Sequence, residues 1–374
     1  MRILALLHDS FGGHGGVAQF NRHFLTAAAG APDTQEVVAL PRLVPSPPGP
    51  LPARLTFDLR AAGSKGRYAV AALRAVLLGG RFDVVVCGHL RLLWLGFLAA
   101  RLARAPLVLI VHGIDAWTPG RSALVNRLVR RVDAVLSVSE FTKQKLLGWA
   151  GLPDARVRVV PPAVNPGQFG PGPRDPALLA RYKLDGKAVI LTLARLVGPE
   201  RRKGVDEVLD CLPALLRRRP DLVYLVAGDG SDRPRLEAKA RRLGIATHVV
   251  FCGRVAEAEK ADHYRLADAF VMPGRTEGFG IVYLEAIACG VPVVGSKLDG
   301  SRDALRDGRL GILVDPRDPD EVGAGILAAL ERPKGVPEGL DDFHFDCFAR
   351  RVRDLLAAVA PRAGRRSRAP TIRA

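Results

Sequence analysis

The chain has 374 residues, of which 48% are hydrophobic and 25% are charged, and its formal net charge at pH 7 is +17. This length allows two or three domains with full cores, and the composition is that of an ordinary soluble globular protein. The five cysteines are odd in number and scattered singly, which argues against a disulfide framework or a zinc site and favours a reducing compartment.

The N-terminal segment begins directly with a predicted strand over residues 2–7. It lacks a basic region followed by an apolar one, so we expect no signal peptide. The most apolar stretch, residues 92–111, contains Arg101, Arg104 and Pro106. It therefore predicts a helix followed by a buried strand, and not a membrane span.

Short apolar strands alternate with helical segments along the chain, a pattern that predicts parallel, doubly wound α/β sheets. Residues 161–176 are rich in proline and glycine and form the natural hinge between two series of strands. The strands are expected at 3–7, 36–40, 84–87, 107–111, 134–138 and 157–160 in the first series, and at 188–193, 223–227, 249–252, 269–272, 291–295 and 311–314 in the second.

A glycine-rich loop, residues 8–17, follows the first predicted strand and opens a helix. Glycines at this position bring backbone N–H groups toward a phosphate. The loop is neither a GxGxxG dinucleotide fingerprint nor a Walker loop, since no Gly-Lys-Ser/Thr sequence follows. The residues alone leave two interpretations open, a flexible turn or a phosphate-binding loop.

Polar residues also follow later strands of the first series. His112 ends the predicted strand 107–111, and a histidine at the carboxyl end of a parallel strand faces the ligand crevice. A lone histidine is, however, more often a satisfied polar group. Ser139 is expected to cap the helix that begins at Glu140. We interpret Glu140 as mainly structural, with contact to a ligand in the crevice as the alternative.

The segment from Glu277 to Glu285 combines a glycine turn, Gly278-Phe279-Gly280, with two glutamates. Their spacing predicts carboxylates about two turns apart on roughly one face of a helix. Because a helix N-terminus favours an anion, the segment predicts a phosphate site with a carboxylate at its mouth. A surface helix with two solvated glutamates is the alternative.

This segment resembles the E-x7-E signature of retaining glycosyltransferases, in particular glycosyltransferase family 4, whose members have the GT-B fold. Other stretches match the family in the same order and spacing, so that the similarity is almost continuous from about residue 187 to 330. The matching stretches are LARLVGPERRKGVD, LVAGDGSDRPRLE, VVFCGRV, RTEGFGIVYLEAIACGVPVV and DGSRDALRDGRLGILVDPRDP.

The resemblance implies two Rossmann-like, doubly wound domains that face a central cleft. Residues 1–165 would form the N-terminal acceptor domain, and residues 166–342 would form the nucleotide-sugar donor domain. A helix over 343–360, where the sequence has helical periodicity, would pack back onto the N-terminal domain. Residues 361–374 would form a basic, disordered tail.

A basic pair is the first catalytic element that the resemblance implies. Arg195 and Lys203 resemble the cations that neutralise the donor diphosphate, and fixed cations stabilise the charge of a departing nucleoside diphosphate. Their separation is longer than in many relatives, so Arg201 or Arg202 competes with Lys203 for this role.

The sugar and nucleotide contacts are also implied by the resemblance. Glu277 would bind hydroxyl groups of the sugar, and His112 would contact the transferred sugar from the acceptor domain. The remaining donor contacts, made by backbone near the phosphates and by one carboxylate at the ribose, would come from Gly15, Gly16, Phe279, Gly280, Ile281 and Glu285.

The family implies retention of anomeric configuration by front-face attack, in which the leaving phosphate helps to deprotonate the acceptor hydroxyl. We find no second carboxylate that would form a glycosidase-like nucleophile and acid pair. The chain also has no DxD-type donor-metal motif in a matching place. We therefore expect a metal-independent enzyme without a cofactor.

The positive charge is concentrated at the two ends of the chain. Residues 1–160 carry 20 Lys and Arg against 9 Asp and Glu, and residues 361–374 carry 5 Arg and no acid. Such a surface attracts polyanions or the anionic leaflet of a membrane, by about 1 kcal/mol per basic residue near the surface. We expect a cytoplasmic protein, peripheral on the inner face of the plasma membrane. A genome rich in arginine would explain the same charge.

The sequence thus predicts a retaining hexosyltransferase that takes a GDP- or UDP-sugar, mannose included, and a lipid-linked or polysaccharide acceptor in surface polysaccharide or glycolipid biosynthesis. A synthase of the sucrose or trehalose type, with a soluble acceptor, is the nearest alternative. A non-catalytic binder of nucleotide sugars or polyanions is less well supported, because Glu277, His112 and Arg195 are all present. Nucleic acid is not an expected partner, since no binding motif is recognised and aromatic residues are only 6% of the chain.

Overall fold

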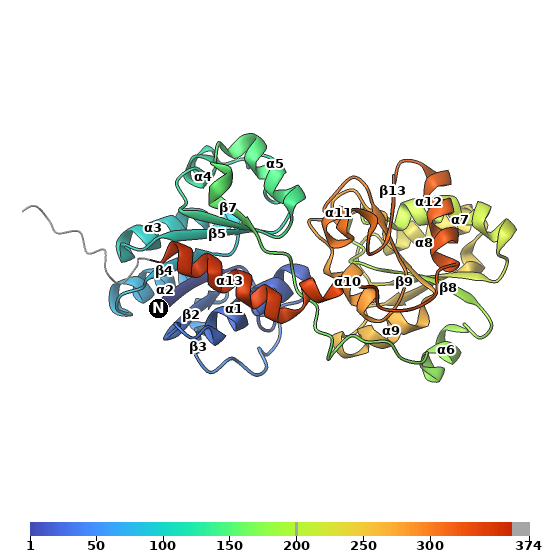
Figure 1. Cartoon of the computed structure of the whole chain (residues 1–374), viewed down its shortest axis with the longest axis horizontal. Helices are drawn as coiled ribbons and strands as arrows, with labels where there is room; N and C mark the ends of the chain where they lie inside the picture. The colour runs from blue at the N-terminus through green and yellow to red at the C-terminus, as the bar shows by residue number, and fades with distance from the viewer. Residues whose placement is uncertain (199–200, 361–374) are drawn as a thin grey trace, which may run out of the picture.

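The computed structural model describes residues 1–198 and 201–360, which form two α/β halves side by side (Figure 1). Within the described residues, the first half contains a seven-stranded parallel sheet of order β3-β2-β1-β4-β5-β6-β7, and the second a six-stranded parallel sheet of order β10-β9-β8-β11-β12-β13. The strands are β1 (Arg2–Leu7), β2 (Glu36–Pro41), β3 (Leu55–Phe57), β4 (Val84–Cys87), β5 (Leu107–Val111), β6 (Ala134–Ser137), β7 (Val157–Val159), β8 (Ala188–Leu193), β9 (Leu222–Ala227), β10 (Val249–Gly253), β11 (Ala269–Val271), β12 (Val293–Ser296) and β13 (Ile312–Val314).

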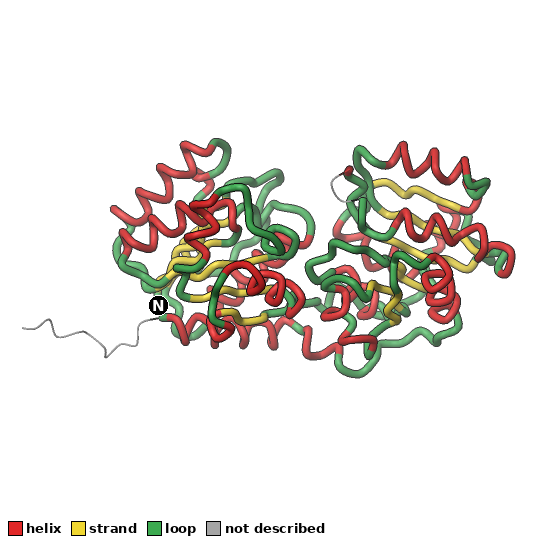
Figure 2. Tube along the Cα trace, turned by 90° about the horizontal axis from the view of Figure 1, so that it is seen from above, coloured by secondary structure: helices red, strands yellow, loops and turns green. Residues whose placement is uncertain are grey.

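Helices cover both faces of each sheet, as Figure 2 shows from a second direction. Alternate residues of a strand point to opposite faces. In β1, Ile3 and Leu7 therefore pack in the cluster that contains α1 and α13, whereas Leu4 and Leu6 pack in the cluster that contains α2 and α3. The helices are α1 (Gly16–Gly30), α2 (Lys65–Leu78), α3 (Leu93–Ala103), α4 (Ala123–Val129), α5 (Glu140–Ala150), α6 (Pro176–Tyr182), α7 (Val205–Arg218), α8 (Arg233–Arg242), α9 (Lys260–Leu266), α10 (Ile281–Ala288), α11 (Ser301–Ala304), α12 (Pro319–Leu330) and α13 (Phe345–Val359).

The predicted strand pattern is confirmed, with bounds that differ from the predicted ones by at most two residues. The apolar stretch 92–111 forms α3 and β5, as expected. The structure adds β3, which the sequence analysis missed. This strand is three residues long and pairs only with β2, so its formation depends on that pairing rather than on an apolar pattern of its own.

The order of strands reverses between β1 and β4 and again between β8 and β11. In doubly wound sheets, ligands bind at the carboxyl ends of the strands beside such a reversal. Both reversal points are central in their sheets, so the fold provides one crevice per half. The expected architecture of two Rossmann-like halves is therefore present.

The chain crosses between the halves twice, and the two crossings lie side by side. The backbone N–H of Val164 donates to the carbonyl of Phe343 at 2.9 Å, and Val164 forms a parallel bridge with His344. Helix α13 then packs on α1 of the first half. Its buried side chains recur with helical spacing, which gives the helix one apolar face, and they are Phe348, Val352, Leu355 and Leu356. Residues 361–374, predicted to be a disordered tail, lie outside the described residues.

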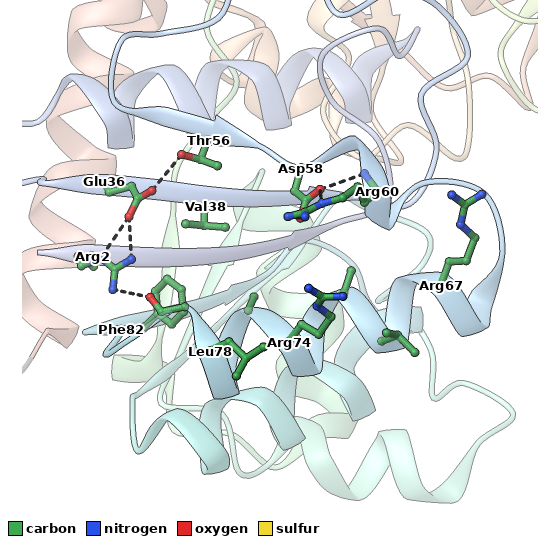
Figure 3. Close-up of a pocket in the computed structure, with 14 residues that line it drawn as sticks. Arg2, Glu36, Val38, Thr56, Asp58, Arg60, Arg67, Arg74, Leu78 and Phe82 are labelled. Carbon is green, nitrogen blue, oxygen red and sulfur yellow. Dashed lines mark hydrogen bonds and ion pairs between the residues drawn. The ribbon is translucent and has the colours of Figure 1, made fainter.

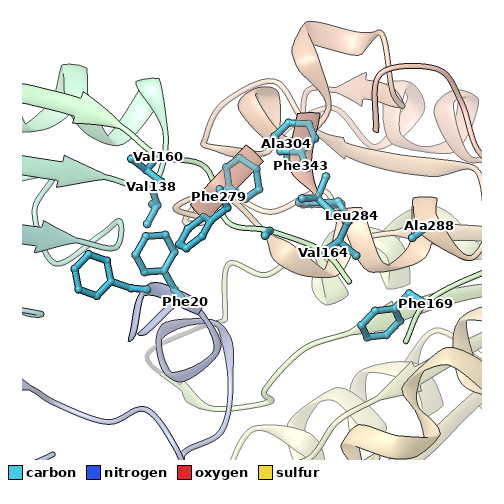
Figure 4. Close-up of a cluster of buried hydrophobic side chains, with 14 of the residues drawn as sticks. Phe20, Val138, Val160, Val164, Phe169, Phe279, Leu284, Ala288, Ala304 and Phe343 are labelled. Carbon is cyan, nitrogen blue, oxygen red and sulfur yellow. The ribbon is translucent and has the colours of Figure 1, made fainter. Parts of the chain in front are cut away.

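One hydrophobic cluster continues from the first half through the crossing into the second. Figure 4 shows Phe20 and Val138 of the first half near Phe279 and Phe343 of the second. The rings of Phe279 and Phe343 are 5.7 Å apart, and the ring of Phe20 lies 5.4 Å from that of Phe348. The two halves therefore share a core where they meet.

We predict that Phe348→Ala lowers the free energy of unfolding by about 3–4 kcal/mol, because it removes a fully buried ring from the contact between α13 and α1. Urea unfolding followed by circular dichroism would measure the change. Arg353→Ala on the exposed side of the same helix is the control, with an expected change below about 0.5 kcal/mol. Equal effects of the two substitutions would contradict the docking of α13.

Candidate functional site

The carboxyl ends of the central strands of both sheets lie at the junction of the halves. His8 follows β1, and His112 follows β5. Arg195 follows β8 in the second half, and its positive charge acts on the carboxyl of Asp9 in the first half. Burial raises the pKa of Asp9, and the charges of His8 and Arg195 partly oppose this rise. The two crevices thus face each other as one site.

A short ion pair marks the second half of this site. Lys203 Nζ donates to Glu277 Oε2 at 2.6 Å, and the two side chains are 20% and 17% exposed. Lys203 precedes Gly204, the N-cap residue of α7, which has a left-handed φ of 94°. The structure therefore brings together a cation and a carboxylate that are far apart in the sequence, at a place that a ligand can reach.

The loop that carries Glu277 is fixed through its backbone. The N–H of Glu277 donates to Asp299 Oδ2 at 2.9 Å, and its carbonyl accepts from the N–H of Gly300 at 2.9 Å. Gly280 has a φ of 90°, and a Cβ on this residue would lie 2.3 Å from the ring of Tyr283. The turn therefore requires glycine at this position.

One expectation for this segment is wrong. Helix α10 begins at Ile281, so Glu277 lies in the preceding loop, and the two glutamates do not share a helix face. The required φ at Gly280 is the physical reason, because a residue in the left-handed region cannot continue a helix toward its N-terminus. The two carboxylates consequently have different surroundings.

Glu285 is fully buried in α10. Its Oε2 accepts from the Tyr264 hydroxyl at 2.7 Å, and its Oε1 accepts from Gln19 Nε2 at 3.3 Å and lies 3.7 Å from Lys260 Nζ. Gln19 belongs to α1 of the first half. Glu285 therefore stabilises the contact between the halves in this structure, beside the glycine-rich loop.

Asp299 is a site residue that the sequence analysis missed. It is fully buried, and burial raises the pKa of its carboxyl to about 6. Besides Glu277, it accepts hydrogen bonds from the N–H and the hydroxyl of Ser301, at 3.0 and 2.6 Å. Its only signal in the sequence is an Asp-Gly-Ser turn soon after a buried strand, and its role depends on a partner 22 residues away.

The glycine-rich loop opens α1 at the same junction. Gly15 precedes α1 with a φ of 85°, and a Cβ there would meet no atom within 4 Å. A Cβ on Gly16 would meet only Ile281 of the second half, at 3.9 Å. The space around these glycines is open, and the first N–H groups of a helix have no partner within the helix. An anion therefore fits here.

Three neighbouring strands end in a cluster of histidines. The ring of His89 lies 5.7 Å from that of His8 and 6.5 Å from that of His112. Burial lowers the pKa of all three, to about 3 for His89 and to about 4 for His112. His112 Nε2 lies 3.0 Å from the carbonyl of Gly88, so the neutral ring donates from Nε2 and keeps Nδ1 as an acceptor. The sequence analysis singled out only His112, although His8 and His89 also follow strands.

The other predicted residues are placed as follows. Arg201 Nε donates to Asp232 Oδ1 at 2.9 Å, and the carbonyl of Arg202 accepts from the N–H of Arg275 at 2.8 Å. The Phe279 ring is buried against Phe343, so only the backbone of this residue is available to a ligand.

Ser139 caps α5 as expected, by accepting from the N–H of Thr142 at 3.0 Å. The side chain of Glu140 is 49% exposed and accepts from Gln144 at 2.6 Å. Its carboxylate is therefore partly solvated at the start of the helix.

A cavity of about 660 Å³ lies elsewhere, between α2 and the neighbouring strands β1, β2 and β3 (Figure 3). Arg2 and Glu36 form an ion pair there, and Arg60 pairs with Asp58. The cavity lies on the face of the sheet that α2 covers, and none of its lining residues belongs to the crevice described above. This cavity is therefore separate from the candidate site.

Comparisons with known proteins identify relatives for both halves. The family profile described as Glycosyltransferase Family 4 matches residues 15–168, and that described as Glycosyl transferases group 1 matches residues 179–338. GDP-mannose-dependent alpha-(1-6)-phosphatidylinositol monomannoside mannosyltransferase of Mycolicibacterium smegmatis is 34% identical over 282 residues, which are 70% of this chain and 73% of the relative. D-inositol 3-phosphate glycosyltransferase of Geodermatophilus obscurus is 33% identical over 302 residues, which are 75% and 66% of the two chains.

Solved structures show the same fold at lower identity. Anabaena Alr3699/HepE in complex with UDP-glucose superposes with a TM-score of 0.71 at 18% identity, over 96% of this chain and 100% of that chain. The lipopolysaccharide outer core galactosyltransferase WaaB in its apo form gives a TM-score of 0.72 at 18% identity, over 96% and 99%.

Proposed function

This chain belongs to glycosyltransferase family 4, and on that premise we propose that it transfers mannose from GDP-mannose to an inositol-containing lipid. It is a glycosyltransferase with the two-domain GT-B architecture. The finer proposal is supported by one observation above others, the 34% identity to a GDP-mannose-dependent enzyme over most of both chains. Residues 1–165 would bind the acceptor and residues 166–342 the donor.

The proposed reaction retains the anomeric configuration. The bond between the anomeric carbon and the donor phosphate breaks, and the acceptor oxygen forms a bond on the same face. The acceptor proton passes to the leaving phosphate. Arg195 and Lys203 would neutralise that phosphate, a role that fixed cations fill without a metal. No metal or other cofactor takes part in this proposal.

The sugar would lie between the loop of Glu277 and the end of β5. Glu277 would accept from sugar hydroxyls while Lys203 holds its carboxylate at 2.6 Å. His112 is neutral at pH 7, because burial lowers its pKa to about 4, so it would contact the sugar through a hydrogen bond and not through charge.

The nucleotide would extend along the start of α10. Gly15 and Gly16 would close over the diphosphate, and the backbone of Phe279, Gly280 and Ile281 would approach the sugar or phosphate. Glu285 would hold the ribose. Because its carboxylate is fully buried here, ribose binding requires that side chains around it, Gln19 of the first half among them, move to let the ribose approach.

The outer surface of the first half fits an anionic bilayer. No helix among the described residues is long and apolar enough to cross a membrane. However, Trp94, Leu98 and Leu102 are 40% to 48% exposed at four-residue spacing on α3, and Leu77 and Leu78 are exposed on the neighbouring α2. Exposed arginines accompany them at positions 74, 101 and 104. We assign this apolar and basic face to peripheral docking on the inner leaflet, where lipid acceptors lie.

A soluble inositol acceptor is a second candidate. It is favoured by the 33% identity to a D-inositol 3-phosphate glycosyltransferase. Both candidates share an inositol ring, and they differ in whether the acceptor carries lipid chains.

The donor is tested by thermal unfolding in the presence of GDP-mannose, UDP-glucose and ADP-glucose, each with and without EDTA. We expect that GDP-mannose raises the melting temperature and that EDTA does not change the shift, since a ligand at 100 times its Kd stabilises by about 2.7 kcal/mol. Transfer of labelled mannose to phosphatidylinositol mannoside in vesicles, and to inositol 3-phosphate in solution, then identifies the acceptor class. A shift with UDP-glucose alone would overturn the mannose donor.

The two glutamates are expected to differ in substitution experiments. Glu277→Ala would lower kcat/KM at least about 100-fold without changing the melting temperature, because a partly exposed site carboxylate is lost. Glu285→Ala would cost less activity but about 1–3 kcal/mol of stability, because the buried Tyr264 hydroxyl loses its acceptor. Steady-state kinetics and urea unfolding measure both quantities. Small, equal losses of activity would show that neither carboxylate belongs to the site.

Membrane docking is tested with the double substitution Trp94→Ser and Leu98→Ser. We expect at least about tenfold weaker binding to vesicles that contain phosphatidylglycerol, since each side chain contributes about 1.5–3 kcal/mol when buried. Vesicle sedimentation measures the binding. Val336→Ser is the control, because this residue is similarly exposed, at 47%, but lies in the second half. Unchanged binding of the double variant would remove this face from the proposal.

A further inference from the structure

Helix α5 of the first half meets α11 of the second half across the junction (Figure 1). Asp303 Oδ1 accepts from the N–H of Glu140, and its Oδ2 accepts from the N–H of Phe141, both at 3.1 Å. These N–H groups belong to the first turn of α5 and have no partner within the helix. A carboxylate of one half therefore completes the N-terminus of a helix in the other.

Ser139, the cap of α5, also contacts the second half. Its hydroxyl accepts from the N–H of Thr142 at 3.0 Å and donates to the carbonyl of Gly278 at 2.6 Å. The Thr142 hydroxyl lies 3.4 Å from the same carbonyl, and both side chains are fully buried. A hydroxyl has one proton and two lone pairs, so Ser139 can cap the helix and hold Gly278 at once.

Next to these hydrogen bonds, the backbones of Gly113 and Gly278 lie so close together that neither residue could carry a side chain. A Cβ on Gly278 would lie 2.2 Å from the carbonyl oxygen of His112, and a Cβ on Gly113 would lie 2.8 Å from the Cα of Gly278. A Cβ on Gly300 would lie 2.2 Å from the carbonyl oxygen of Gly278. The loop of Glu277 is thus held between the end of β5 in the first half and the segment 299–303, which includes the start of α11, in its own half.

The same segment fixes Glu277 and carries Asp303. Asp299 accepts from the N–H of Glu277, Gly300 donates to its carbonyl, and Asp303 lies four residues after Asp299. Movement of α5 away from Asp303 and Gly278 would therefore remove one side of the support of this loop.

We propose that Ser139 and Asp303 are positioning residues for the transfer reaction, which fix the loop of Glu277 against His112 when the two halves close on the substrates. The inference rests on the proposed role of Glu277 at the sugar. It assigns to α5 a function beyond packing, since the helix N-terminus is completed only when the halves are together.

Two helix-capping residues elsewhere in the chain serve as controls, because their substitution removes a cap without affecting the contact between the halves. Asp318 accepts from the N–H groups of Asp320 and Glu321 at the start of α12, within its own half. Ser122 caps α4 by accepting from the N–H of Val125. Asp303→Ala is therefore compared with Asp318→Ala, and Ser139→Ala with Ser122→Ala.

Two readouts are measured on the full chain, namely amide hydrogen exchange and steady-state kinetics with GDP-mannose. We expect Asp303→Ala to speed exchange at Glu140 and Phe141 about tenfold, since the charged acceptor of both amides is lost. We also expect Asp303→Ala and Ser139→Ala to lower kcat/KM about five- to tenfold, because the closed fraction falls. Ser139→Thr keeps the hydroxyl and should restore most of the activity.

The controls Asp318→Ala and Ser122→Ala should lower stability by the loss of an exposed helix cap but leave kcat/KM unchanged. Unchanged exchange at Glu140 and Phe141 in Asp303→Ala would overturn the proposal, as would kinetic losses no larger than those of the controls. A wild-type chain that transfers no sugar would instead overturn the proposed function, and the exchange rates would still decide whether Asp303 holds α5.

Discussion

The backbone contact between Gly113 and Gly278 sets the distance between the two halves. With a side chain on either residue, the halves would have to separate, because a Cβ would come within 3 Å of opposing backbone atoms. The glycines allow the end of β5 to lie against the loop of Glu277. They also allow the hydrophobic cluster to continue through the junction, where Phe279 packs on Phe343. The site therefore requires residues without side chains at Gly113 and Gly278 as well as the functional side chains around them.

The two halves contribute groups of different charge to the site, because the histidines of the first half are buried and neutral. The second half contributes charges, with Arg195 exposed and Lys203 paired to Glu277. The first half contributes His89 and His112, whose pKa values burial lowers to about 3 and 4, so their rings are neutral at pH 7. In the proposed reaction, cations on one side would match the charged diphosphate of the donor, and hydrogen-bonding groups on the other would match a neutral sugar and a hydroxyl acceptor.

Features that depend on local patterns could be predicted from the sequence. Alternating apolar segments predicted the strands and the two-sheet architecture, because parallel strands buried on both faces must be almost wholly apolar. The cap at Ser139 and the helix over 345–359 follow from short-range rules in the same way. The family resemblance rested on glycine and carboxylate positions within one continuous region, and the family profiles confirmed it.

Only the tertiary structure decided which residues meet across the junction. Asp299 holds the backbone of Glu277, Asp303 completes α5, and Glu285 is buried against Gln19, and none of these pairs is close in the sequence. By itself the sequence determined the elements and the polar residues at their ends, because those depend on neighbours a few positions apart. Which residues become partners depends on how the two sheets are placed relative to each other. Close packing of backbone and core side chains fixes that placement. The contacts involved join residues far apart in the sequence, so no local pattern predicts them.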